Sequence, residues 1–194
     1  MGIGKQAKIL TPKQQEFVLC YLTSTRYPLR NKIIFLLSFK AGLRAKEISA
    51  LTWNMVCDSQ GNLSDVLTLP NEATKGRYSG RIIPLHKELK QALNEYIQPD
   101  IDLTHHVISS ERDNKMSAQA IVNFFYTLYK TLNLIGCSSH SGRRTFITQS
   151  AQIISKAGGT LNDIKQLAGH SSISTTQRYI EYNTDAQKKI IELI

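Results

Sequence analysis

The apolar run IIFLLSF, at residues 33–39, limits most strongly what this chain can fold into. The run is much shorter than the ~20 consecutive apolar residues that a membrane-spanning helix needs. It therefore predicts a buried helix over about residues 31–40. Gly42 follows closely, as at a helix that ends with a glycine in the left-handed conformation. A chain of 194 residues around such a helix has the size of one large domain with a single packed core.

Local start and stop signals predict further helices around this one. Thr11 and Pro12 precede Gln14, which is the pattern of a threonine N-cap, a first-turn proline and a glutamine that reaches back to the cap. Thr160 and Asp163 give another start signal after a Gly-Gly pair. Besides the helix from Pro12 and a short one through Glu47, helices are predicted at residues 87–97, 117–133, 141–157, 161–168, 175–182 and 185–194.

Residues 53–85 break this helical pattern. Short extended runs there, separated by the turn sequences DSQGN and TKGRYSG, predict a small antiparallel sheet of three strands, the last at about residues 81–84. The sequence contains no internal repeat and no low-complexity linker. The predicted fold class is therefore mostly α with a small three-stranded antiparallel β-sheet. We expect a single domain over residues 1–194, with an N-terminal tail at 1–9 and a C-terminal tail helix at 183–194.

The charge of the chain favours polyanionic partners. Lys and Arg outnumber Asp and Glu by 24 to 15, a formal net charge of +9 that suits nucleic acid or an anionic membrane surface. The first residues, MGIGKQAK, lack the apolar core of a secretory signal, so we expect a cytoplasmic protein. The three cysteines form no C-x-x-C pair and are interpreted as reduced, apolar residues. The adjacent His105 and His106 have poor geometry for a metal site.

Four short motifs hold residues that are each ordinary when taken alone. In chain order they read AGLRAKEISALTW, ATKGRYSGRIIPL, SSHSGRR and LAGHSSISTTQRYI. A single tyrosine there is most simply a half-buried aromatic, a single histidine a structural residue, and an arginine or lysine a solvated or ion-paired charge. Together, in this order and with this spacing, the motifs resemble the catalytic domain of the tyrosine recombinases, the lambda-integrase or phage integrase family, over about residues 10–182.

The resemblance implies the fold of that catalytic domain and six catalytic residues. Tyr179 would be the nucleophile, and His140 and Arg143 would form an H-x-x-R pair. The complete set is Arg44, Lys75, His140, Arg143, His170 and Tyr179. The implied reaction joins the tyrosine to a 3′ phosphate of DNA and frees a 5′ hydroxyl. A 5′ hydroxyl of a second duplex then attacks that linkage, so that strands are exchanged without ATP.

These residue types suit the chemistry of a phosphodiester. The transition state gathers negative charge on the non-bridging oxygens, and fixed guanidinium groups such as those of Arg44 and Arg143 lower its energy. A tyrosine phenol, with a pKa of ~10, is protonated near neutral pH and needs help to attack. His140 is a candidate proton acceptor or hydrogen-bond partner, and His170 is a candidate to brace the phosphate or the tyrosine. The sequence leaves the division of these roles open.

The leaving 5′ oxygen also needs a proton, which Lys75 on a mobile hairpin can deliver. Nearby, Arg77 and Arg81 are expected to contact backbone phosphates. The other predicted DNA contacts are Lys46 and Arg144. No acidic cluster indicates a two-metal site, and the arginines can supply electrostatically what Mg²⁺ would otherwise supply. We therefore predict no metal and no nucleotide cofactor.

The chain departs from the family pattern near its start. Members usually carry a separate helical DNA-binding domain before the catalytic one, and here about ten residues precede the first predicted helix. We therefore expect no N-terminal core-binding domain, as in the short branch that includes fimbrial phase-variation invertases. The alternative is a fragment or decayed copy that binds DNA weakly. The interval between Arg143 and His170 is a few residues longer than usual, which predicts a longer helix or turn with the catalytic positions kept.

The C-terminal tail is too apolar for a free end. Ile190, Ile191, Leu193 and Ile194 cluster there, with two lysines on the other side. The tail either docks on its own core or, as the resemblance implies, inserts into a neighbouring protomer and links a tetramer on paired DNA sites. The expected partners are double-stranded DNA and further copies of the chain, with no membrane, and the expected source is a bacterium or phage.

Two other functions remain open. A DNA-binding regulator or decayed recombinase would keep the fold without strand exchange, and the presence of all six catalytic residue types argues against it. A type IB topoisomerase-like enzyme would use the same pocket to nick and reseal one duplex. The short length and the LAGHSSISTT context favour recombination.

Overall fold

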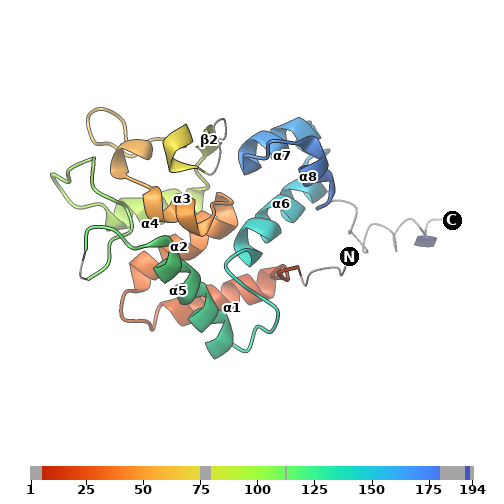
Figure 1. Ribbon diagram of the computed structural model, residues 1–194, viewed down its shortest axis with the longest axis horizontal. Helices are drawn as coiled ribbons and strands as arrows, with labels where there is room; N and C mark the ends of the chain where they lie inside the picture. The colour runs from red at the N-terminus through yellow and green to blue at the C-terminus, as the bar shows by residue number, and fades with distance from the viewer. Residues whose placement is uncertain (1–5, 75–79, 112, 180–190, 193–194) are drawn as a thin grey trace.

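Helices surround one apolar helix, and a small sheet lies at one side of them (Figure 1). This computed structural model of the protein describes residues 6–74, 80–111, 113–179 and 191–192. In chain order the elements are α1 (Pro12–Leu22), α2 (Pro28–Lys40), α3 (Ala45–Ala50), the 3-10 helix η1 (Trp53–Met55), β1 (Val66–Leu69), the 3-10 helix η2 (Asn71–Ala73), β2 (Arg81–Pro84), α4 (Lys87–Tyr96), α5 (Ala118–Thr131), α6 (Ser141–Ile153), α7 (Leu161–Ala168) and α8 (Ile173–Gln177).

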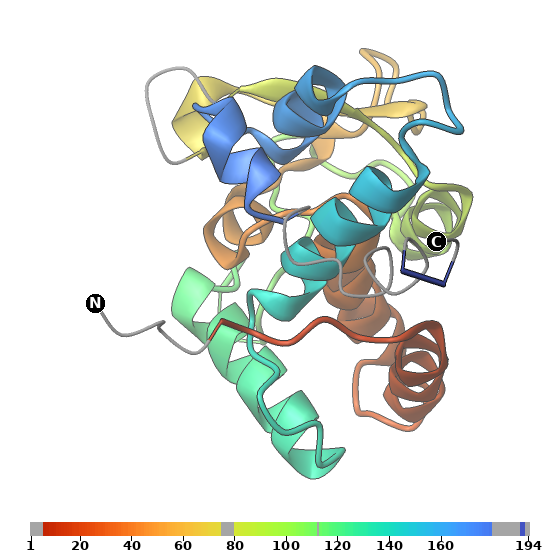
Figure 2. The ribbon, with the colours of Figure 1, turned by 90° about the vertical axis from the view of Figure 1, so that its right-hand side faces the viewer.

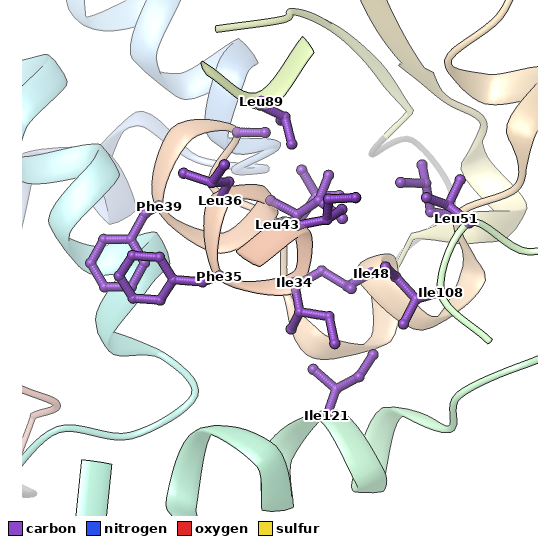
Figure 3. Close-up of a cluster of buried hydrophobic side chains, with 14 of the residues drawn as sticks. Ile34, Phe35, Leu36, Phe39, Leu43, Ile48, Leu51, Leu89, Ile108 and Ile121 are labelled. Atoms are coloured by element: carbon purple, nitrogen blue, oxygen red, sulfur yellow. The ribbon is translucent and has the colours of Figure 1, made fainter. Parts of the chain in front are cut away.

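Helix α2 lies at the centre because it is apolar on every side. Residues 33–39 are all buried, and the helix packs against α1, α3, α4 and α6. Figure 3 shows Ile34 pointing toward Ile121 of α5, while the rings of Phe35 and Phe39 stack on another side, with centroids 4.2 Å apart. The predicted buried helix is therefore confirmed. Neither α2 nor any other helix in the described part of the chain is long and apolar enough to cross a membrane.

Local sequence signals place most helix ends correctly. Thr11 caps α1 as predicted, since its hydroxyl accepts from the Gln14 N–H and the Gln14 side chain accepts from the Thr11 N–H. Helix α7 spans the predicted residues and begins with a capping box. Helix α2 begins earlier than predicted, at Pro28, because the first turn of a helix does not use the missing proline N–H. Helix α6 ends at Ile153 rather than at residue 157, and turns follow up to Gly158, whose φ is +70°.

The sheet has two strands in the described residues, where the sequence predicts three. Strands β1 and β2 pair antiparallel, with Val66 opposite Pro84. In place of another strand, residues 53–63 form η1 and a single bridge between Cys57 and Leu63. The carboxylate of Asp58 accepts hydrogen bonds from the backbone N–H groups of residues 60 and 62. Backbone hydrogen bonds from the Asp58 N–H to the Asn62 carbonyl and from the Ser64 N–H to the Val56 carbonyl flank the bridge, and the pairing beyond this turn stops there.

Helices α6 and α7, which lie beside α8, form a second, smaller apolar cluster. Ile147, Ile164 and Ala168 are its fully buried members, and Tyr179 packs against them. In Figure 1 these three helices lie together on the right of the molecule, and α6 joins them to the main core by packing against α2. The start of α6 therefore lies between the two clusters, close to the ends of the other helices.

The segment before α1 is attached to α6, so residues 6–10 are not a free tail. The Lys8 N–H donates to the carbonyl of Gly136 at 2.9 Å, and the Leu10 N–H donates to the hydroxyl of Thr145 on α6 at 3.0 Å. The Leu10 side chain is buried in the core. In Figure 2 this segment runs beside the start of α6.

Helices α2 and α6 approach so closely that Gly142 cannot carry a side chain without a shift. A Cβ atom there would lie 2.1 Å from the Ser38 hydroxyl and 2.8 Å from the Phe39 ring. We expect Gly142→Ala to lower the free energy of unfolding by about 2 kcal/mol, as overpacking of a core does, and the melting temperature by about 4–8 °C. Urea and thermal denaturation measure both. The exposed Gln152→Ala on the same helix is the control, and equal stability of the two variants would contradict the prediction.

Candidate active site

A pocket of about 530 Å³ lies where the N-terminal segment, the start of α3, the start of α6 and the segment around α8 meet. Figure 1 shows α3 and β2 on one side of this region and α6, α7 and α8 on the other. The predicted site residues that line it are Arg44, His140, Arg143, Arg144, His170 and Tyr179. Side chains more than 130 positions apart in the sequence thus share one cavity.

None of the other predicted site residues that the structure describes lines this pocket. Lys75 and Arg77 are outside the described residues. Lys46 is exposed on α3, and Arg81 is buried at the start of β2; neither lines the pocket. The pocket therefore brings together five of the six residues predicted to be catalytic.

Arg44 is held at the start of α3 by a carboxylate beneath it. Its backbone N–H donates to Glu47 at 2.8 Å, and its guanidinium donates to the same carboxylate at 2.9 Å. The Glu47 side chain is 1% exposed, whereas the Arg44 side chain is 32% exposed. One side of the guanidinium is thus anchored to the protein, and the exposed part faces the pocket.

Glu47 is also the partner of Arg81. Two guanidinium nitrogens of Arg81 donate to the two carboxylate oxygens, each at 3.0 Å, and its Nε donates to the Leu167 carbonyl at 2.9 Å. Burial acts to raise the pKa of Glu47, but the hydrogen bond and charge of Arg81, and then Arg44, outweigh it and lower the pKa. Glu47 is therefore ionised. The prediction that Arg81 contacts DNA phosphates is revised, because its side chain is 4% exposed and directed into the protein.

Arg143 lies in the first turn of α6 and is almost fully buried. Its guanidinium donates to the Gly42 carbonyl at 2.7 Å and to the Ala168 carbonyl. Burial, and next the charge of Arg44, lower the pKa of Arg143 to about 9, so the group is still charged at neutral pH. Gly42 has φ +64°, the left-handed conformation predicted for the end of α2. This bend turns the chain toward Arg44 and places its carbonyl against Arg143.

The C-terminal end of α7 has a hydrogen-bond donor for each of its last four carbonyls, at residues 165–168. Backbone N–H groups of His170 and Gly169 donate to the first two of them. Arg81 donates to the third, and Arg143 donates to the fourth. Helix ends leave such carbonyls unpaired within the helix, and positive charge is favourable beside them. The two arginines therefore fix the position of the turn that leads into His170.

His170 follows this turn and is 9% exposed. Its Nδ1 atom is hydrogen-bonded to the Thr176 hydroxyl at 2.9 Å, and its ring stacks on that of Tyr179 with centroids 5.7 Å apart. Burial, and next the charge of Arg143, lower the pKa of His170 to about 4. The imidazole is therefore neutral at physiological pH, held between a helix and the phenol ring.

We expect the imidazole of His170 to stay neutral as the pH falls from 8 to 5.5. Its folded pKa of about 4 lies below the ~6.5 of an unfolded chain, so the unfolded state binds more protons in this window, and the free energy of unfolding falls as the pH drops. An NMR titration of the ring signals measures the midpoint of His170 in the folded chain, with the urea-unfolded chain as the reference. A folded-state midpoint above pH 6 would show that burial does not control this group.

Tyr179 lies two residues beyond α8, half-buried, with its backbone N–H bonded to the Thr176 carbonyl at 3.0 Å. The helix before it begins earlier than predicted. Ser172 is the N-cap, because its hydroxyl accepts from the Ser174 N–H. The predicted range, 175–182, is replaced by Ile173–Gln177, and residues 180–182 lie outside the described part.

Two residues at the start of α6 complete this side of the pocket. His140 is exposed at the N-cap position, where its backbone N–H donates to the Ser138 hydroxyl at 3.3 Å. Arg144 donates to the Ala7 carbonyl at 2.8 Å, which ties the N-terminal segment to the pocket edge. Both residues line the pocket together with Arg143.

Some residues that line this pocket were not predicted from the sequence. Those that line it and were not predicted are Gln6, Ala7, Ser138, Thr175 and Arg178. Arg178 had a usable signal, because a basic residue directly precedes the predicted nucleophile. Nothing local in the sequence marks the N-terminal segment as part of a site.

Residues that could hold a metal do not gather in the part of the chain that the structure describes. No three His, Cys, Asp or Glu side chains there come together in a suitable group. The prediction of a reaction without a metal stays a prediction.

Comparison with known proteins gives a family match over most of the chain. The model of the phage integrase family matches residues 8–185. The tyrosine recombinase XerA of Thermococcus kodakarensis is 26% identical over 187 residues, which are 95% of this chain and 62% of that protein. The chain thus spans less than two thirds of the length of this relative.

Solved structures share the fold. A crystal structure of XerA recombinase superposes with a TM-score of 0.72 and 21% identity, covering 100% of this chain and 66% of that one. The Tn1549 transposon integrase, in complex with a circular intermediate DNA, gives a TM-score of 0.68 and 22% identity, covering 97% of this chain and 66% of that one. The predicted mostly helical fold with a small antiparallel sheet agrees with both.

Proposed function

The chain belongs to the phage integrase family, and we propose that it is a site-specific DNA recombinase that cuts and rejoins strands through a 3′-phosphotyrosine intermediate. One observation supports this most. Tyr179 lines a single pocket with Arg44 and Arg143, which come from two other elements. A phenol beside two guanidinium groups places a nucleophile next to an anion site, which is what attack on a phosphodiester requires.

In the first step, the Tyr179 oxygen attacks the phosphorus of a DNA strand. The new bond joins that oxygen to phosphorus, and the bond from phosphorus to the 5′ oxygen breaks. The phenol proton passes to a base, and the leaving 5′ oxygen takes up a proton. We propose Lys75 as the donor of that proton. Lys75 lies outside the described residues, so this proposal is based on its place in the sequence motif.

Arg44 and Arg143 stabilise the charge that develops on the non-bridging oxygens. Arg143 is fixed by two backbone carbonyls and Arg44 by Glu47, so neither has to reorganise when the charge appears. Preorganised donors in a partly water-excluded site are the most effective kind of electrostatic stabilisation.

The two histidines have different environments, which favours different roles. With a pKa lowered to about 4, His170 is a poor proton acceptor near neutral pH and is better suited to orient the phenol ring on which it stacks. His140 is exposed at the pocket and is our candidate to accept the phenol proton.

In the second step, a 5′ hydroxyl of a second duplex attacks the phosphotyrosine and releases Tyr179. The number of phosphodiester bonds is conserved, so no ATP is needed. This step needs paired duplexes, and we propose that further copies of the chain bring them together through the C-terminal tail. Residues 180–190 and 193–194 of that tail lie outside the described part. Lys46, Arg77 and Arg144 remain the proposed phosphate contacts.

The test is incubation in EDTA with supercoiled DNA that carries the sequence flanking this reading frame, followed by an SDS quench. We expect a covalent protein–DNA adduct whose peptide map places the DNA on Tyr179, together with recombinant product when two sites are present. Adduct and relaxed circles without recombinants would indicate a nicking-closing enzyme. Salt-sensitive binding without any adduct would indicate a DNA-binding regulator and overturn the proposal.

A further inference from the structure

Arg81 lies beneath the pocket, with every part of its guanidinium directed at the protein. Nη1 and Nη2 meet the two oxygens of Glu47, and Nε meets the Leu167 carbonyl. The fit depends on Gly169, which has φ +60° and where a Cβ atom would lie 2.7 Å from Nη1 of Arg81. Such a planar, bidentate arrangement on a carboxylate is specific to arginine.

These contacts connect separate parts of the site. Arg81 is the first residue of β2, six positions after Lys75 in the sequence. Its hydrogen bonds to Glu47 connect it to α3, where the same carboxylate accepts a hydrogen bond from Arg44. Through the Leu167 carbonyl it meets the end of α7, three residues before His170. The Arg81 side chain therefore connects β2 to α3 and to the end of α7.

We propose that Arg81 is a positioning residue for strand cleavage, which aligns Arg44 through the Glu47 carboxylate and His170 through the Leu167 carbonyl. The inference deepens the proposed function and rests on it. In this role Arg81 acts through Glu47 and the Leu167 carbonyl, because its own side chain is only 4% exposed.

The charged groups around Glu47 indicate how the protonation of its carboxyl would change if Arg81 were replaced. The charged groups that act on Glu47 are Arg44 on its own helix, Arg81 of β2 and Arg143 of α6. Arg81 provides two of the hydrogen bonds to the buried carboxylate. Without it, burial favours the protonated carboxyl, which is a weaker anchor for Arg44.

The first arm of the test measures cleavage by Arg81→Gln against pH, beside DNA affinity. We expect cleavage at pH 8 to fall about 100-fold with Kd for DNA changed less than about threefold, since only the transition state is affected. As the pH is lowered we expect cleavage by Arg81→Gln to fall further relative to wild type, because Glu47 takes up a proton more readily without Arg81. The double variant with Glu47→Gln should lose that extra pH dependence, because no carboxyl is left to titrate.

Arg81→Lys keeps the buried charge but not the fork, and we expect intermediate cleavage. Arg81→Lys is also the variant to measure if Arg81→Gln does not fold. Arg26→Gln is the control, since Arg26 is a 76% exposed arginine paired with Glu111. A loss of cleavage that merely follows the loss of DNA affinity, or a pH profile of Arg81→Gln parallel to that of wild type, would overturn the inference.

The second arm needs no DNA and separates failure of the inference from failure of the proposed function. In NMR spectra of the full chain, the ring signal of His170 should move in Arg81→Gln, less in Arg81→Lys, and not in Arg26→Gln. An unmoved signal in Arg81→Gln would overturn the alignment of His170. If wild type forms no adduct with DNA, the proposed function fails, and this arm still decides whether Arg81 positions His170.

Discussion

Tyr179→Phe is expected to lower the yield of covalent protein–DNA adduct by at least about 10⁴-fold, because the variant has no oxygen with which to attack phosphorus. The phenylalanine ring can keep the stacking on His170 and the packing against the α6–α7 cluster. Stability should therefore change by less than about 1 kcal/mol, and Kd for DNA by less than about threefold. The measurement is adduct formation after an SDS quench, with gel-shift binding in parallel.

Tyr126→Phe is the matched control, because Tyr126 is a 64% exposed tyrosine on α5, away from the pocket. It should cleave as wild type does. A second tyrosine, Tyr182, lies three residues after Tyr179 in the sequence. An adduct that persists in Tyr179→Phe and disappears in Tyr182→Phe would show that the nucleophile has been misassigned.

Arg143→Gln should have the next largest effect, with cleavage lowered about 10³-fold. Removal of one preorganised donor from a site of developing negative charge costs about 10²–10³-fold, and here a full charge is lost as well. The Gly42 and Ala168 carbonyls also lose their donor. Because buried groups left unpaired cost about 1–3 kcal/mol, we expect the free energy of unfolding to fall by about 2 kcal/mol.

Cleavage at matched folded fractions, fixed by urea denaturation, separates the two effects. Arg178→Gln is the control, since Arg178 is an exposed arginine of the same pocket. We expect it to lower cleavage by no more than about tenfold, through weaker attraction of the phosphate. A loss in Arg143→Gln equal to that in Arg178→Gln would mean that Arg143 acts only through the general charge of the pocket.

The parts of the fold that were predicted correctly have local causes. The apolar run at 33–39 can be buried only at the centre, and the threonine caps of α1 and α7 bond to residues three positions away. Gly42 bends the chain through its own backbone freedom. Such causes lie within a few residues in the sequence, so a single chain reveals them.

The incorrect predictions concern features that depend on residues far away in the sequence. Arg81 follows a basic turn, and only the folded chain shows that Glu47, 34 positions earlier, receives its guanidinium. A third strand was expected around DSQGN because the turn is visible in the sequence, whereas the extent of pairing depends on Asp58 and on the neighbouring elements. The position of residues 6–10 depends on α6, more than 130 positions away. Motif order identifies the family of the site, but not the side chains that hold it in place.

The attachment of residues 6–10 to α6 has a consequence for how the protein is handled in the laboratory. Because Gln6 and Ala7 form part of the pocket wall, a purification tag fused ahead of them would be attached close to the pocket that we propose binds DNA. A bulky or acidic tag there would compete with the substrate and mimic an inactive enzyme. Recombination assays should use protein from which such a tag has been removed by a protease.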